Sequence, residues 1–63
     1  MKLGSRITVH CKEVNFGDTA VVMLYGQLLG ETKSSITVGV GGRFFVIPWE
    51  GIIYLERLEE DNL

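Results

Sequence analysis

Apolar and polar residues alternate along much of this chain, which is the pattern of β-strands that bury one face. In the first such run, Ile7, Val9 and Cys11 are apolar and the residues between them are polar. No stretch of useful length shows the 3.6-residue apolar period of a helix. The pattern therefore predicts an all-β chain, with strands at residues 7–12, 19–31, 36–40, 44–47 and 52–57.

Turn-forming residues separate the predicted strands. Asn-Phe-Gly-Asp at residues 15–18 supplies the first turn, and the polar residues 31–35 supply the second. Gly41-Gly42 indicates a two-residue hairpin turn, because both central positions of a type I′ turn need a positive φ angle.

The long second strand contains two glycines, Gly26 and Gly30. Glycines inside a strand mark places where it bends tightly or where another backbone comes close. One bent strand can serve both halves of a barrel. We therefore predict five antiparallel strands that follow one another as a meander and form a small, strongly bent barrel.

The fourth and fifth predicted strands are apolar on both faces. Residues 44–47 and 52–55 are wholly apolar, and only Pro-Trp-Glu-Gly at 48–51 separates them, which is enough for a sharp corner. A strand that is apolar on both faces normally needs both faces covered. A chain of 63 residues has little protein available for the second face. We expect copies of the chain to cover it.

Composition supports self-association. We expect one domain over residues 1–63, with its core at about 6–57 and an acidic tail at 58–63, and a core of this size rarely supplies more than about 3 to 5 kcal/mol. Cys11 is the only cysteine and His10 the only histidine, which excludes an internal disulfide and the usual four-ligand zinc site. The chain is nevertheless 46% hydrophobic. Part of that apolar area is expected to lie in an interface.

Charge permits nucleic-acid binding without favouring it. The net charge is −2, but the residues before Glu56 carry five Lys or Arg and four Asp or Glu, a net charge of +1. A dedicated nucleic-acid module usually has a clear basic excess. No segment reaches the roughly 18 to 20 apolar residues of a membrane span, and the first residues lack the apolar region of a signal peptide. We expect a cytoplasmic protein without membrane contact.

Two patterns resemble motifs of a known family. Val-Ile at residues 46–47, the short corner and Ile-Ile-Tyr-Leu at residues 52–55 form the first. Gly-Gln-Leu at residues 26–28, the polar loop and Ile-Thr-Val at residues 36–38 form the second. Together they resemble the Sm-like family, the ring-forming RNA-binding barrels that include Sm proteins and bacterial Hfq. The resemblance covers roughly residues 6–57.

The resemblance implies a closed homo-oligomeric ring of about five to seven subunits. In such a ring the fourth strand of one subunit pairs with the fifth strand of the next, which would satisfy otherwise exposed strand edges. The chain departs from the family at its RNA-contacting positions, since residues 31–35 lack the Asp and Asn, and Pro48-Trp49 replaces Arg-Gly. The family's N-terminal helix is nearly absent, because only residues 1–5 precede the first strand.

The polar loop and the corner supply the candidate nucleic-acid contacts. Trp49 is either a stacking platform for bases or an aromatic that packs over the barrel mouth or into a neighbouring subunit. Lys33 is either a flexible cation for phosphate or part of a solvated turn. Repetition around a ring would multiply a weak contact. The candidate residues are Lys33, Ser34, Ser35, Pro48 and Trp49.

The sequence offers no catalytic arrangement, because the only histidine stands beside a cysteine expected in the core. We expect no enzyme activity, no cofactor and no metal. The leading hypothesis is a homo-oligomeric, ring-forming Sm-like protein that binds single-stranded RNA or DNA in nucleic-acid processing. The alternative is a small β-barrel that serves as a protein-interaction or assembly subunit without nucleic acid. The acidic balance and the missing family residues favour the alternative, whereas the ring-like pattern of the last two strands favours the leading hypothesis.

Overall fold

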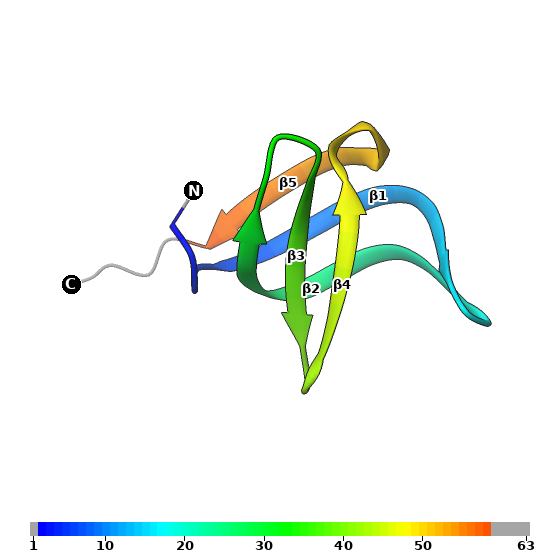
Figure 1. Cartoon of the computed structure of the whole chain (residues 1–63), viewed down its shortest axis with the longest axis horizontal. Coiled ribbons are helices and arrows are strands. Elements are labelled where there is room, and N and C mark those ends of the chain that lie inside the picture. The colour runs from blue at the N-terminus through cyan, green and yellow to red at the C-terminus, as the bar shows by residue number, and fades with distance from the viewer. Residues whose placement is uncertain (1, 59–63) are drawn as a thin grey trace.

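The computed structural model describes residues 2–58, and it shows one five-stranded antiparallel sheet (Figure 1). The predicted all-β class and five antiparallel strands are confirmed. Within residues 2–58 there is no α-helix, and no helix is long and apolar enough to cross a membrane. The elements are β1 (Arg6–Phe16), β2 (Thr19–Glu31), β3 (Ser35–Val40), β4 (Arg43–Pro48), the 3-10 turn η1 (Trp49–Gly51) and β5 (Ile52–Leu58).

The second and third predicted turns are where the sequence indicated, whereas the first is shorter than predicted, because β1 continues through Asn15 and Phe16 and only residues 17–18 turn. Gly41 and Gly42 connect β3 to β4 and have φ angles of 54° and 84°, so the two positive values expected of this hairpin are confirmed. Gly17, with a φ of 65°, turns the chain from β1 into β2. The acidic tail predicted at residues 58–63 begins at the last residue of β5, and its remaining five residues lie outside the described part of the chain.

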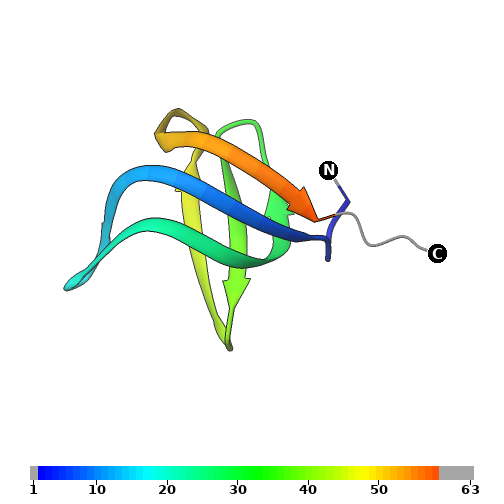
Figure 2. The same ribbon diagram turned by 180° about the vertical axis from the view of Figure 1, so that it is seen from behind.

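The predicted meander ends at the fourth strand. The strand order is β4-β3-β2-β1-β5, so β5 lies beside β1 and not beside β4, as Figure 2 shows from behind. The corner at η1 carries the chain across the end of the sheet, and Leu55 then pairs with Val9 and Ile52 with Cys11. This pairing packs Ile52 and Leu55 of β5 against the core. Both β4 and β5 are edge strands, and the sheet is not closed into a barrel.

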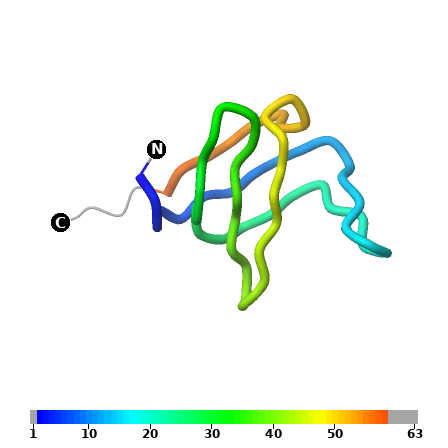
Figure 3. The backbone as a smooth tube through the Cα atoms, viewed as in Figure 1, coloured from blue at the N-terminus to red at the C-terminus, as the bar shows by residue number. Residues whose placement is uncertain are grey.

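Strand β2 belongs to both halves of the sheet. Residues 19–27 pair with β1, and residues 27–31 pair with β3. These pairings meet at Gln27, and a Cβ atom at the adjacent Gly26 would overlap the carbonyl oxygen of Gly39. The absence of a side chain thus permits the close approach of β2 and β3. Figure 3 shows the result, with β3 and β4 running across the direction of β1, β2 and β5.

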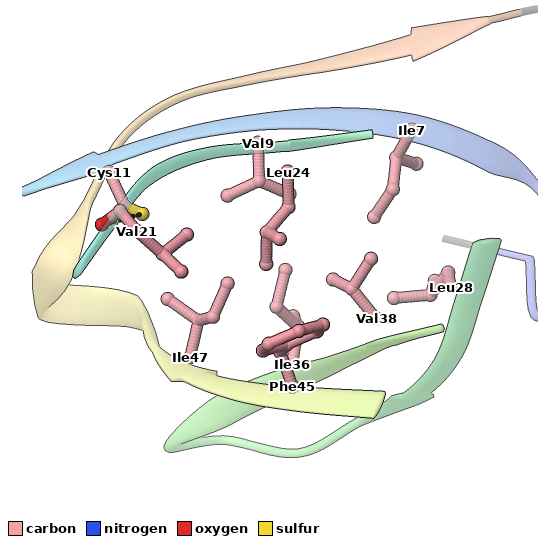
Figure 4. Close-up of a cluster of buried hydrophobic side chains, with 10 residues drawn as sticks. All are labelled: Ile7, Val9, Cys11, Val21, Leu24, Leu28, Ile36, Val38, Phe45 and Ile47. Carbon is pink, nitrogen blue, oxygen red and sulfur yellow. Dashed lines mark hydrogen bonds between the residues drawn. The ribbon is translucent and has the colours of Figure 1, made fainter. Parts of the chain in front are cut away.

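The core lies between these two halves of the sheet (Figure 4). Cys11 points into it and is buried, as predicted, and burial raises the pKa of its thiol. At one end Phe16 packs edge-on against Phe45, with ring centroids 5.0 Å apart. The buried residues of this core within residues 2–58 are Ile7, Val9, Cys11, Val21, Leu24, Leu28, Ile36, Val38, Phe45 and Ile47.

The edge strands leave apolar side chains in solvent. Phe44 and Val46 of β4 are 69% and 47% exposed, whereas Phe45 and Ile47, which alternate with them, are buried. Ile53 and Tyr54 of β5 are 68% and 56% exposed. One face of each strand is therefore covered by the chain itself, and the other apolar face is open.

Candidate nucleic-acid interface

The polar turn before β3 and the corner after β4 meet at one end of the β3–β4 hairpin (Figure 1). The antiparallel register brings them together, because Ser35 at the start of β3 pairs with Pro48 at the end of β4. Residues 32–34 and 49–51 extend beyond this last pair. We call residues 32–35 and 48–51 together the turn–corner surface.

Trp49 connects the two segments through two hydrogen bonds. Its backbone N–H donates to the carbonyl oxygen of Ser34 at 3.0 Å, and its indole Nε1–H donates to the carbonyl oxygen of Thr32 at 2.9 Å. The indole also packs against the core and is half-buried. The ring is therefore held in one orientation while part of it remains accessible.

Thr32 organises the turn from within. Its Oγ1 accepts hydrogen bonds from the backbone N–H groups of Ser34 at 3.1 Å and Ser35 at 3.0 Å. Its own backbone N–H donates to the carbonyl oxygen of Ser35 at 2.8 Å. Threonine is well suited to this role, because its hydroxyl can replace a backbone acceptor in a tight turn. Sequence reasoning did not identify Thr32 as a residue that organises the turn. The signal that could have identified it was a threonine just before Lys33-Ser34-Ser35 in the polar loop.

The structure brings all five predicted site residues to the turn–corner surface. Lys33, Ser34 and Pro48 are exposed, whereas Ser35 and Trp49 are half-buried. One part of the indole of Trp49 packs against the core and another part is open, and its role as a stacking platform for bases stays a prediction. Its polar atom is occupied by Thr32, so the accessible part of the ring can offer only apolar and stacking contacts.

The charge at this surface is balanced. Glu31 stands two positions before Lys33, and Glu50 follows Trp49 at the corner. Glu31 already has a partner within the protein, and Glu50 is exposed. A single cation beside acidic groups makes a weak field, so recognition here would depend on stacking and hydroxyl contacts more than on attraction to phosphate.

The remaining chemistry-bearing residues are dispersed. The ring of His10 lies on the outer face of the sheet, 5.6 Å from the ring of Tyr54, while the adjacent Cys11 points into the core. Across residues 2–58 there is no group of three or more His, Cys, Asp or Glu residues that could hold a metal ion.

Comparisons of this chain with protein-family models, with curated proteins and with solved structures find no match. The Sm-like resemblance therefore stays a prediction, and it rests on the sequence patterns at residues 26–38 and 46–55.

Proposed function

We propose that this chain assembles through its edge strands into an Sm-like ring and binds single-stranded RNA or DNA at the turn–corner surface. The observation that carries the proposal is the pair of hydrogen bonds by which Trp49 joins the turn to the corner. These bonds create one continuous surface from two segments that are distant in sequence. This surface holds a fixed aromatic ring on the corner and a cation and hydroxyl groups on the turn.

A fixed indole is a suitable stacking platform for a base. Base–aromatic stacking contributes about 1 to 3 kcal/mol per base and tolerates any sequence, because every base has a π-face. The ring of Trp49 is already ordered by Thr32 and the core, so binding would cost little additional side-chain entropy. Lys33 and Ser34 are exposed beside it and can contact the sugar–phosphate backbone.

Assembly would make this modest site effective. Both edges of the sheet carry exposed apolar side chains, and an exposed apolar edge strand readily pairs with another chain. Pairing of β4 with β5 of the next subunit would cover Phe44, Val46 and Ile53. Each added subunit would place another turn–corner surface within reach of the same strand, and later contacts would then be intramolecular.

Binding assays at several salt concentrations test the proposal. We expect the assembled protein to bind oligo-U, oligo-A and single-stranded DNA with similar affinity. Lys33→Gln should lower the slope of log affinity against log salt concentration, because one phosphate contact per subunit is lost. Lys12→Gln, which removes an exposed cation on β1, should leave the slope unchanged and is the matched control. Lack of affinity for all three strands at low salt would exclude the nucleic-acid role.

That last result would favour the second candidate function, a protein-interaction or assembly subunit without nucleic acid. The observation that supports it is the combination of exposed apolar edge strands with a turn–corner surface of balanced charge. Under this function Trp49 would have only a structural role. Assembly without affinity for any oligonucleotide is its expected signature.

A further inference from the structure

A second candidate site lies on the outer face of the sheet, at the far end of β3 from the turn–corner surface. It is a cleft of about 320 Å³ lined by Arg6, Tyr25 and Gln27 and by the glycine-containing segment at residues 39–41. Strand β3 separates this segment from Ser35, and six residues of strand span roughly 17 Å. The two sites are therefore distinct.

The register of the sheet explains why these side chains meet. Arg6 of β1 lies directly opposite Gln27 of β2, and Gln27 in turn lies opposite Gly39 of β3. Leu24 and Leu28 of β2 point into the core, so the residues between them at odd positions point outward. Tyr25 and Gln27 are thus neighbours on one face, and Arg6 lines the same cleft.

Glycines form part of the wall of this cleft. Gly39 is an outward position of β3, and the side chain of Leu29 fills the space beside it, because a Cβ atom at residue 39 would lie 2.7 Å from Cδ1 of Leu29. Gly41, with a positive φ of 54°, turns the chain away at the rim, and a Cβ atom there would meet no atom within 4 Å. The glycine segment is therefore open at Gly41 and covered by Leu29 at Gly39.

We propose that this cleft binds a nucleotide through its base and its phosphate. A phenol ring, an amide and a guanidinium lie within one site, and these groups provide stacking, paired hydrogen bonding and phosphate recognition. Tyr25 stacks on the base, Gln27 hydrogen-bonds its polar edge, and Arg6 holds the phosphate. The volume is at the lower end of the roughly 300 to 1,000 Å³ of small-molecule sites, which suits one nucleotide. The ligand is a free nucleoside monophosphate or one unit of a strand.

Amide chemical-shift titration of the whole protein with AMP, UMP, adenosine and inorganic phosphate tests the proposal. We expect AMP to shift the amides of residues 6, 25–27 and 39–41. Arg6→Gln should weaken AMP binding by about tenfold through loss of a charge-assisted contact, with little effect on adenosine. Tyr25→Phe should keep affinity and Tyr25→Ala should lose most of it. Arg6 and Tyr25 are exposed, so these variants should keep the dispersed spectrum of the folded protein.

Two control variants separate this site from the rest of the molecule. Arg43→Gln removes a cation that lies over the ring of Phe45, outside the cleft, and should leave AMP binding unchanged. Trp49→Phe should also leave it unchanged, which keeps this inference independent of the turn–corner surface. Short oligo-A that binds tighter than AMP would identify a strand as the ligand, and equal affinity would identify the free nucleotide.

Three outcomes would overturn the proposal. The first is an absence of shifts at these residues with AMP at about 10 mM, a concentration above the Kd of even weak specific ligands. The second is that inorganic phosphate binds as tightly as AMP, which would show that the cleft recognises an anion and does not recognise a base. The third is equal AMP affinity in the wild type and in Arg6→Gln.

Discussion

The indole nitrogen of Trp49 lies 2.9 Å from the carbonyl oxygen of Thr32, a residue 17 positions earlier in the chain, and donates a hydrogen bond to it. The bond joins the corner that follows β4 to the turn that precedes β3. It also accounts for a tryptophan at a corner where many apolar residues could pack, because an indole combines a large apolar body with a single donor.

Trp49→Phe isolates the contribution of that hydrogen bond. Phenylalanine keeps an aromatic ring against the core but has no donor for Thr32, so we expect the free energy of unfolding to fall by about 0.5 to 1.5 kcal/mol. Trp49→Ala also loses the packing and should cost about 2 kcal/mol or more. Urea unfolding followed by circular dichroism measures both. Equal stability of the phenylalanine variant and the wild type would show that the bond is not formed in solution.

Alanine substitutions at Gly26 and Gly30 should have different effects on stability, although both glycines lie within β2. A Cβ atom at residue 26 would overlap the backbone oxygen of Gly39, whereas at residue 30 the nearest atoms belong to Thr37 at 3.7 Å. Gly26→Ala should therefore destabilise the protein by about 2 to 3 kcal/mol. Gly30→Ala should be neutral or slightly stabilising, because alanine restricts the unfolded chain. Similar losses in both variants would contradict the close approach at Gly26.

Much of the fold could be predicted from local sequence. Alternation placed Ile7, Val9 and Cys11 in the core, and Gly41-Gly42 specified a hairpin whose φ angles the structure confirms. Both signals are local, since strand period and positive φ are properties of a few consecutive residues. The proximity of residues 32–35 to Pro48-Trp49 could also be predicted in part, because a hairpin between two segments places its two ends side by side.

The partner of β5 was not predictable in the same way. The apolar pattern at residues 52–55 is compatible with pairing to β4 or to β1. The direction in which the corner at Trp49 leads the chain determines which strand β5 pairs with, and this direction is a three-dimensional property. The outer cleft was missed for a related reason. Arg6, Gln27 and Gly39 are distant in sequence and become neighbours only through the register of three strands.

Cys11 should behave as an inert thiol. Burial raises its pKa above the ordinary value of 9.0, so the folded state keeps the thiol neutral where the unfolded state ionises. Stability from this group is therefore fully present below about pH 9 and is lost as pH rises through the folded-state pKa. We expect Cys11→Ala, although less stable at pH 7, to lose less stability than the wild type as the pH rises above about 9. Native-state alkylation should be slow and should accelerate in urea, and fast alkylation of the folded protein would contradict the burial.

The exposed apolar edges lead to the prediction with the widest consequences. Light scattering coupled to size-exclusion chromatography should give a discrete multiple of the 7.0 kDa chain mass, about five to seven subunits if a closed ring forms. Val46→Lys and Ile53→Lys each put a charge on an outward position of an edge strand and should shift the mass toward one subunit. Leu3→Lys, at an equally exposed apolar residue outside both edges, should not.

The reason for these expectations is that a charge on an edge strand must lose its hydration when another strand packs against it, whereas the free subunit leaves it in water. Circular dichroism should show unchanged strand content in both edge variants, because neither side chain contributes to the core. A wild-type protein that is a monomer at every concentration would contradict the ring. The open apolar faces of β4 and β5 would then have to belong to an interface with a different protein.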